Sequence, residues 1–275
     1  MRNENSRIAV LGGDRRQEIL TELLLADGKN VDLILGADDL PRLSRAELVV
    51  FPTPMLRPDS TVGNTGIPAE EIFRFLPRGS IAAGGRVTDS CRALAAERDV
   101  ALLDYTAREE FAVSNALATA EAALALALTE LPTTLQGSAC LVAGAGRIGM
   151  LLARRLALLG AEVTVSARSA RDLARIAADG LRPVRTADLA AHVGAFDLLY
   201  NTVPAVVFTR EVLAVMRPTA LLYDLASAPG GVDWHAAKEL GRQARAELSL
   251  PARYAPCSAA AYLRDSLMQI WEEQH

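Results

Sequence analysis

The 275-residue chain contains few of the residues that bind metals or form cross-links. Its three cysteines, Cys91, Cys140 and Cys257, are odd in number and widely spaced, which argues against a disulfide framework or a zinc site. Its three histidines are also scattered, and none has a serine or cysteine at the spacing of a nucleophile motif. We therefore expect no bound metal and no hydrolytic triad.

The chain also lacks long runs of one chemical character. Its formal net charge is −4 and it has no basic block, which disfavours nucleic acid as a partner. No apolar run reaches the roughly 18 residues of a membrane span, because Glu121 and Glu130 interrupt the alanine-rich stretch 116–131. The first residues are polar, with no apolar signal core. These absences predict a cytoplasmic protein that binds neither membranes nor nucleic acid.

The most informative segment is a glycine-rich turn between an apolar run and an apolar helical pattern. Residues 140–143 are apolar, and Gly144, Gly146 and Gly149 follow at the G-x-G-x-x-G spacing. Such glycines permit a tight turn, the approach of a pyrophosphate and close packing of helix on strand. The start of the helix would offer N–H groups to phosphates. The turn residues expected to bind a nucleotide cofactor are Gly144, Gly146, Arg147 and Ile148.

Strand and helix patterns alternate along the chain in two blocks. This alternation predicts an α/β fold with two Rossmann-like domains, each a doubly wound parallel sheet. We expect a substrate or partner domain over 1–115 and an interdomain helix and linker over 116–136. The cofactor-binding domain would span 137–254, and a C-terminal helix over 255–275 would cross back onto the first domain.

The second strand of the second block suggests which nicotinamide cofactor binds. An acidic residue at the end of this strand binds the ribose hydroxyls of NAD, and here none follows the strand at 162–165. Ser166, Arg168 and Ser169 stand there instead, and a guanidinium suits a 2′-phosphate. We therefore expect NADP rather than NAD. The alternative is that Arg168 and the nearby Arg171 are solvated residues at a helix start.

Polar or turn-forming residues follow two further strands, where ligands of such sheets bind. Asn201, Thr202, Val203 and Pro204 follow one strand, and Asp224 ends another. We expect them to contact the nicotinamide, its ribose or the substrate. The alternative is that they form ordinary turns, in which asparagine and proline are common.

In the first block, Gly12 and Gly13 lead into a helix with arginines nearby, which favours a small anionic ligand. Gly13 and Arg16 are therefore candidate substrate-binding residues, and Arg86, after another strand, could bind a carboxylate. Asp14 has helix capping as its alternative role. Ser114, Thr119 and Glu121 lie on or near the interdomain helix, and Ser258 begins the last one.

The most specific segment of the chain is the run Asp-Leu-Ala-Ser-x-Pro-Gly-Gly-Val-Asp at 224–233. Further motifs are Gly12-Gly13-Asp14-x-Arg16-Gln17, Thr119-Ala120-Glu121-x-Ala123, Glu130-Leu131-Pro132, Gly144-x-Gly146-Arg147-x-Gly149 and the segment 250–256. Together these segments resemble the A-subunit family of dipicolinate synthases over nearly the whole chain. One departure is Cys257-Ser258-Ala259-Ala260, where the family usually has Lys-Thr-Ala-Gly.

The resemblance implies an enzyme of sporulation, acting in the mother cell beside the flavoprotein-like second component of dipicolinate synthase. It would oxidise dihydrodipicolinate, or its hydroxylated tetrahydro precursor, to pyridine-2,6-dicarboxylate with a nicotinamide cofactor. The residues that would bind the dicarboxylate are Gly13, Arg16, Arg86, Ser114, Thr119 and Ser258. Asp14 and Glu121 are the candidate proton acceptors.

Two other functions stay open from the sequence. One is a different two-domain NADP oxidoreductase, similar to shikimate or alanine dehydrogenases, although Lys29 is the only lysine of the first block. The other is a non-catalytic dinucleotide-binding partner. A homo-oligomer is also open.

Overall fold

The computed structural model describes residues 7–274, which fold into two compact units. Unit 1 comprises Met1–Asn115 and Pro251–His275, and unit 2 comprises Ala116–Leu250. Each unit contains one fully parallel sheet between layers of helices. This confirms the predicted fold class of two Rossmann-like α/β domains.

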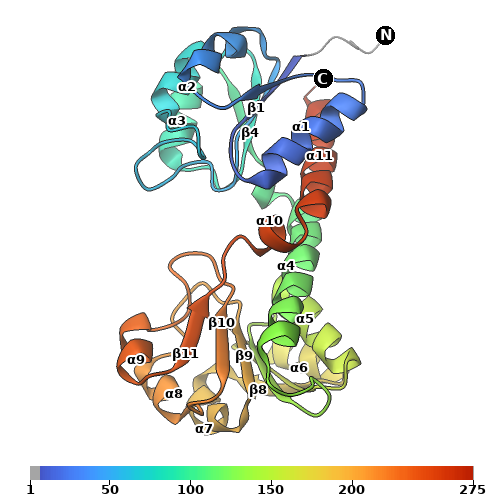
Figure 1. The fold of residues 1–275 in the computed structure, drawn as a ribbon, viewed down its shortest axis with the longest axis vertical. Coiled ribbons are helices and arrows are strands. Elements are labelled where there is room, and N and C mark those ends of the chain that lie inside the picture. The colour runs from blue at the N-terminus through green and yellow to red at the C-terminus, as the bar shows by residue number, and fades with distance from the viewer. Residues whose placement is uncertain (1–6, 275) are drawn as a thin grey trace. The chain divides into compact units, whose positions relative to one another are not determined.

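Unit 1 contains a five-stranded sheet in the order β2-β1-β3-β4-β5. Figure 1 shows α1 (Arg15–Ala26) and α11 (Pro256–Glu273) on one face, with α2 (Ala69–Phe75) and α3 (Asp89–Glu97) on the other. The strands are β1 (Arg7–Leu11), β2 (Asn30–Ile34), β3 (Leu48–Val50), β4 (Ile81–Gly84) and β5 (Ala101–Asp104). The 3₁₀ segments of this unit are η1 (Ala37–Arg45) and η2 (Tyr105–Ala107).

Alternate residues of β1 enter two different cores. Ile8 and Val10 pack in the cluster with α1 and α11, whereas Ala9 and Leu11 pack with α2 and α3. Because successive side chains of a strand point to opposite faces, a strand buried on both faces needs a continuous apolar run. This is why β1 shows no polar alternation in the sequence.

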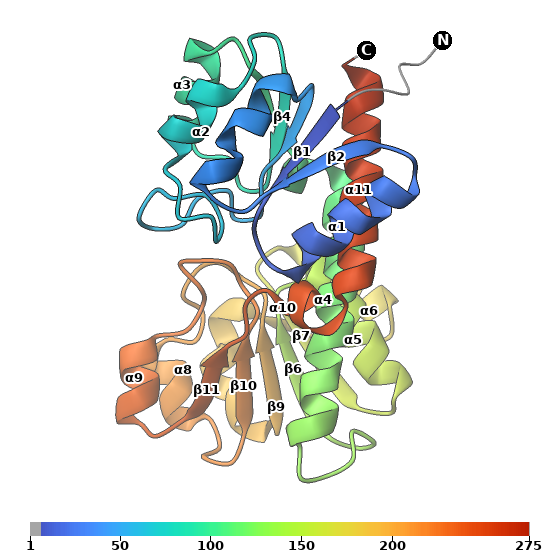
Figure 2. The same ribbon diagram turned by 45° about the horizontal axis from the view of Figure 1, so that its top comes forward.

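Unit 2 contains a six-stranded sheet in the order β11-β10-β9-β6-β7-β8, the Rossmann arrangement. In Figure 2, α4 (Glu109–Glu130), α5 (Arg147–Leu158) and α6 (Ala170–Ala178) lie on one side, and α8 (Arg210–Val215) and α9 (Trp234–Glu239) on the other. The strands are β6 (Ala139–Ala143), β7 (Glu162–Ala167), β8 (Arg182–Arg185), β9 (Leu198–Asn201), β10 (Leu221–Asp224) and β11 (Gln243–Ala246). The remaining elements are η3 (Thr186–Asp188), α7 (Leu189–His192), η4 (Val193–Ala195) and α10 (Leu250–Tyr254).

The helix α4 contributes residues to both units. It begins at Glu109, before the interdomain segment that the sequence analysis placed at 116–136. By length and composition alone it is apolar enough to cross a membrane, but half of its most apolar window is buried inside the protein. One such helix is weak evidence for a membrane span.

The last helix, α11, packs within unit 1. Its Glu273 accepts two hydrogen bonds from the Arg108 guanidinium, at 2.6 and 2.7 Å. Arg264 of α11 lies 3.6 Å from the carboxylate of Asp27, the residue that follows α1. The C-terminal segment is therefore part of the first unit.

Candidate functional site

The glycine-rich turn of unit 2 is bare at its centre. Gly144 leaves β6 with φ +105°, and α5 begins at Arg147. A Cβ on Gly149 would lie 2.0 Å from the Gly144 carbonyl oxygen, so only glycine permits this contact between helix and turn. A Cβ on Gly146 would meet no described atom within 4 Å. The turn therefore leaves open space at the place where a pyrophosphate binds in dinucleotide folds.

Thr202 holds this turn from the end of the neighbouring strand β9. Its backbone N–H and its hydroxyl both donate to the Ala143 carbonyl oxygen, at 2.9 Å each. A Cβ on Gly144 would lie 2.4 Å from the Thr202 hydroxyl and 2.9 Å from the Val203 side chain. Both residues thus lie beside the turn, as their prediction as cofactor-binding residues requires. The exposed Pro204 follows them.

Asn201 and Asp224 join the segments that follow β9 and β10. The Asn201 amide donates to the Asp224 carboxylate at 2.7 Å and to the Val203 carbonyl at 2.9 Å. The other Asp224 oxygen accepts from the Gly231 N–H at 2.8 Å. Both side chains are buried. In this structure they position backbone around the site, and a direct contact with a cofactor stays a prediction.

The tip of β7 carries no carboxylate, because the strand ends at Ala167. Ser169 caps α6, accepting from the Asp172 N–H at 3.0 Å and donating to its carboxylate at 2.6 Å. Ser166 is fully buried, and its hydroxyl has no hydrogen-bond partner among residues 7–274. Arg168 is exposed and makes no ion pair within that range. Its guanidinium is therefore available to an anionic ligand.

The strand register reveals an arginine that sequence reasoning missed. Arg185, the last residue of β8, pairs with Ala167 at the tip of β7. Paired residues of a parallel sheet point to the same face, so Arg185 stands beside the position of the missing carboxylate. It is exposed and, like Arg168, has no ion pair in the described part of the chain. Only the pairing of two distant segments could have identified it.

In unit 1, the start of α1 is built around an ion pair. Asp14 caps the helix, accepting from the Arg16 N–H at 3.1 Å, and binds the Arg16 guanidinium at 2.8 and 2.5 Å. Burial alone would lower the pKa of Arg16, but the hydrogen bonds and charge of Asp14 outweigh it and raise the pKa above its ordinary value. Arg16 therefore stays charged, and Asp14 fills the capping role considered as its alternative.

Arg86 stands at the end of β4 in an unusual backbone conformation. Its φ is +58°, in the left-handed region that non-glycine residues seldom adopt. Its N–H donates to Asp104 at 3.2 Å and to Thr106 at 3.1 Å, and the Val87 N–H donates to Asp104 at 2.9 Å. The guanidinium is exposed and unpaired among the described residues. Strained residues held in this way are frequent at functional sites. The sequence analysis did not identify Asp104 as the residue that accepts these backbone hydrogen bonds.

The remaining predicted residues are more dispersed. Glu121 is exposed and lies 3.5 Å from Arg155, in the last turn of α5. The ion pair places it beside the far half of that helix and not at the glycine turn. Ser114 is half-buried in unit 1, Thr119 is buried in unit 2, and Ser258 is exposed in the first turn of α11. Ile148 is half-buried and Arg147 exposed at the start of α5.

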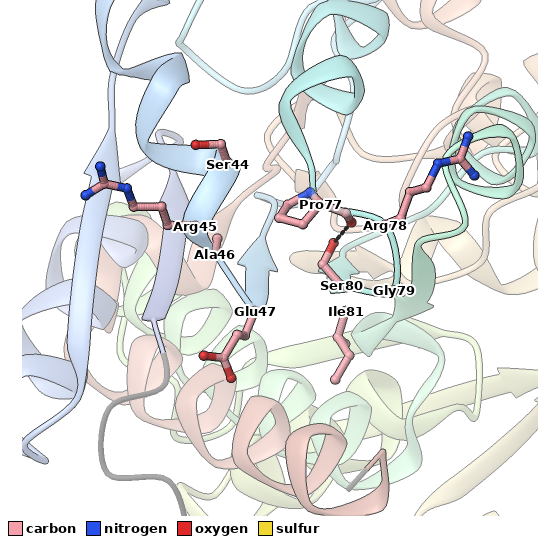
Figure 3. A pocket seen from close by; sticks show the side chains of 9 residues that line it. All are labelled: Ser44, Arg45, Ala46, Glu47, Pro77, Arg78, Gly79, Ser80 and Ile81. Atoms are coloured by element: carbon pink, nitrogen blue, oxygen red, sulfur yellow. Dashed lines mark hydrogen bonds between the residues drawn. The ribbon is translucent and has the colours of Figure 1, made fainter.

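A pocket elsewhere in unit 1 has fewer groups suited to binding a ligand. It has a volume of about 350 Å³ and lies at the amino ends of β3 and β4, the sheet edge opposite Gly13 and Arg86 (Figure 3). Its arginines, Arg45 and Arg78, point away from each other, and the one hydrogen bond drawn joins Ser80 to the Pro77 carbonyl. Across residues 7–274, no three His, Cys, Asp or Glu side chains gather to bind a metal.

Comparison with known proteins agrees with this geometry. Residues 102–229 match the NAD-binding domain of the D-isomer specific 2-hydroxyacid dehydrogenases. Over 97% of this chain and 96% of the relative, the sequence is 31% identical to the dipicolinate synthase A-subunit of Bacillus subtilis.

Solved structures give the same result. The dipicolinate synthase A-subunit from Bacillus halodurans superposes with a TM-score of 0.88 at 28% identity, covering 96% of this chain and 97% of that one. The Bacillus subtilis structure gives 0.86 at 30% identity, covering 98% and 97%. A transhydrogenase from Sinorhizobium meliloti, at 18% identity and a TM-score of 0.70 over 97% and 93%, shares the fold.

The glycine turn, the dehydrogenase domain and these relatives identify a nicotinamide-dinucleotide-dependent oxidoreductase. Because the relatives are single components of a larger synthase, a partner chain is also implied. This chain belongs to the A-subunit family of dipicolinate synthases.

Proposed function

We propose that this chain is the nicotinamide-binding component of a dipicolinate synthase. It would oxidise dihydrodipicolinate to pyridine-2,6-dicarboxylate, the hydroxylated tetrahydro precursor first losing water. The observation that carries the proposal is a relative of that name aligned over 97% of the chain, together with the open Gly146 turn. The reaction would take place in the cytoplasm of the sporulating mother cell.

The reaction balances with one cofactor. The dihydropyridine ring loses a hydride and a proton, and aromaticity of the product favours both losses. When bound, the oxidised nicotinamide supplies the hydride acceptor. The protein must then orient the ring, bind two carboxylates and provide a path for the proton.

For the cofactor we propose NADP. Three features support this choice. Ala167 at the tip of β7 is uncharged, Arg168 after it makes no ion pair among the described residues, and Arg185 lies opposite Ala167 on the neighbouring strand β8. Two guanidinium groups with no carboxylate between them suit a 2′-phosphate. NAD carries only an uncharged ribose hydroxyl at that position, which would leave both guanidinium groups without an anionic partner.

For the substrate carboxylates we propose the carboxyl edge of the unit 1 sheet. Arg86 presents a free guanidinium there, and the turn at Gly13 begins α1, whose first N–H groups have no partners within the helix. Arg16 is buried and bound to Asp14, so it contributes a fixed charge pair. Asp14 is our candidate proton acceptor. Ser114, Thr119, Ser258 and Glu121 stay predictions as further site residues.

The cofactor proposal is tested by fluorescence titration of NADPH and NADH into the full-length chain. We expect the wild type to prefer NADPH. Arg168→Gln and Arg185→Gln should each weaken NADPH binding about tenfold and leave NADH binding unchanged. Arg182→Gln, at the other end of β8 and also exposed, is the matched control. Equal losses for both cofactors would contradict the proposal.

The reaction is tested with the partner. The chain and the flavoprotein-like B-subunit, as the proposed partner, are mixed with NADP and freshly generated dihydrodipicolinate. We expect ultraviolet absorbance of the pyridine product and matching formation of NADPH. Arg86→Gln should lower kcat/KM for the substrate at least tenfold without changing the Kd of NADPH. Absence of pyridine product from the mixed proteins would refute the assignment.

A further inference from the structure

The side-chain amide of Gln17 is buried and makes no hydrogen bond within the described part of the chain. The residue is 2% exposed, and neither Oε1 nor Nε2 has a partner among residues 7–274. Buried polar atoms are nearly always satisfied by protein or water, so an amide with both ends unpartnered requires an explanation. Its hydrogen-bonding capacity is available to a ligand.

The amide lies beneath the turn that begins α1. A Cβ on Gly13 would stand 2.8 Å from Cγ of Gln17 and 3.7 Å from its amide carbon. The same Cβ would lie 2.8 Å from the Pro52 side chain. Gly13 itself is half-buried. The Gln17 side chain therefore packs directly against the Gly13 backbone, at a place that any larger residue 13 would fill.

The surroundings of this turn suit an anion. α1 has twelve residues, and its first N–H groups point out of the helix with the positive end of the helix dipole. The nearest acidic group, Asp14, is neutralised by the Arg16 guanidinium at 2.5 Å. Arg15 is paired with Glu18. The Arg16 and Gln17 N–H groups already donate to Asp14. The turn therefore offers a ligand the N–H groups before them, and it has no unpaired negative charge within the described residues.

The two free ends of the amide define the ligand more closely. The Nε2 group donates hydrogen bonds and Oε1 accepts one, so a complete match needs an acceptor and a donor side by side. A carboxylate with a neighbouring N–H or O–H group offers both. A simple carboxylate would leave Oε1 unsatisfied.

We propose that the side-chain amide of Gln17 recognises a ligand bound at the start of α1 in unit 1. The amide would rotate beside Gly13 and hydrogen-bond to a carboxylate and to the hydrogen-bond donor next to it. The ligand class is a carboxylate whose α-carbon carries a hydroxyl group or a nitrogen that bears hydrogen. The inference rests on the proposed function, because it places the substrate's ring nitrogen, in its N–H form, beside Gln17.

Two probes of equal charge test this. The full-length chain is titrated calorimetrically with 1-hydroxycyclohexane-carboxylate and with cyclohexane-carboxylate, which lacks the hydroxyl. We expect the wild type to bind the hydroxy acid roughly three- to tenfold more tightly, the effect of one hydrogen bond. Gln17→Met, of similar shape but without donor or acceptor, should bind both probes equally and weakly.

Thermal unfolding distinguishes this role from a structural one. Replacing an unsatisfied buried amide by an apolar group of the same shape should keep or raise Tm. Ser266→Ala is the matched control, since Ser266 of α11 is another buried polar group of unit 1 with no hydrogen-bond partner among residues 7–274. It should leave both Tm and the preference between the probes unchanged.

The outcomes separate the inference from the proposed function. A lower Tm in Gln17→Met, an unchanged preference in that variant, or no binding of either probe to the wild type overturns the inference. A Gln17-dependent preference combined with no pyridine product from the mixed proteins keeps the inference and refutes only the dipicolinate synthase assignment.

Discussion

Tyr105 shows how a single side chain supports the carboxyl edge of unit 1. It is fully buried, packs edge-on against Phe111 at 5.2 Å, and donates its hydroxyl hydrogen to the Phe51 carbonyl at 3.1 Å. Burial raises its pKa well above the ordinary value of 10.0, while the charge of Arg16 acts in the opposite direction. The hydroxyl therefore remains a hydrogen-bond donor at all physiological pH values.

This gives a prediction with a defined pH dependence. Tyr105→Phe should lower the free energy of unfolding by about 1 kcal/mol at pH 8, because the Phe51 carbonyl loses its hydrogen bond. The folded pKa exceeds the unfolded one, so the contribution is complete below pH 10.0 and is lost as the pH rises above it. Urea unfolding should show a smaller difference in the free energy of unfolding between the wild type and Tyr105→Phe at pH 10.5 than at pH 8. A constant or larger difference would show that Tyr105 is not the titrating group.

At the scale of elements, the network of Asn201 and Asp224 fastens the segments after β9 and β10. Asp224 accepts hydrogen bonds from the Asn201 amide, the Ala226 N–H and the Gly231 N–H, at 2.7, 3.1 and 2.8 Å. A Cβ on Gly231 would lie 2.0 Å from the Asn201 amide nitrogen, so the glycine is needed for this closeness. The family-specific run at 224–233 therefore encodes a backbone arrangement as well as any ligand contact.

Asp224→Asn tests this network. The new amide group would face buried donors, and we expect a loss of about 2–3 kcal/mol in the free energy of unfolding. Asp233→Asn is the control, because this helix cap of α9 accepts one hydrogen bond, from the Ala236 N–H at 2.9 Å. It should cost well under half as much, since asparagine also caps helices. Equal losses of unfolding free energy in Asp224→Asn and Asp233→Asn, measured by urea unfolding, would contradict a stabilising role of the Asp224 network.

Local signals allowed the sequence to predict much of the fold and part of the site. The glycine turn was predictable because three glycines between a strand and a helix act within a dozen residues. Element ends were less accurate. The interdomain helix α4 begins at Glu109, ahead of the expected segment 116–136, and α10 and η1 were not expected. Arg185 and Asp104 were missed because their roles depend on strand pairing and on a strained residue, which leave no local pattern.

At the scale of the molecule, two Rossmann-like units divide the proposed tasks. Unit 2 contains the open glycine turn with Arg168 and Arg185. Unit 1 contains Arg86 at the carboxyl edge of its sheet and the buried Gln17 amide. The dehydrogenase-family match covers mainly unit 2, whereas the likeness to the dipicolinate synthase A-subunit extends over both. The chemistry of the substrate is therefore expected to depend on unit 1 and on the partner protein.

A bound cofactor should stabilise the whole chain by mass action. At a free NADPH concentration of 100 times its Kd, we expect about 2.7 kcal/mol of added stability, visible as a rise in Tm. Thermal unfolding with and without NADPH measures it. An unchanged Tm at saturating NADPH would contradict cofactor binding to the folded protein.

The central claim is that a nicotinamide dinucleotide lies against Gly146, and titration of NADPH into Gly146→Ala tests it most directly. Gly146 has φ −80° and no described neighbour within 4 Å of a new Cβ, so the variant should fold with a free energy of unfolding within about 1 kcal/mol of the wild type. Gly36→Ala, at another extended and unobstructed helix cap, is the control. We predict at least a roughly tenfold loss of NADPH affinity in Gly146→Ala and none in Gly36→Ala. Undiminished NADPH binding by a correctly folded Gly146→Ala would contradict the claim.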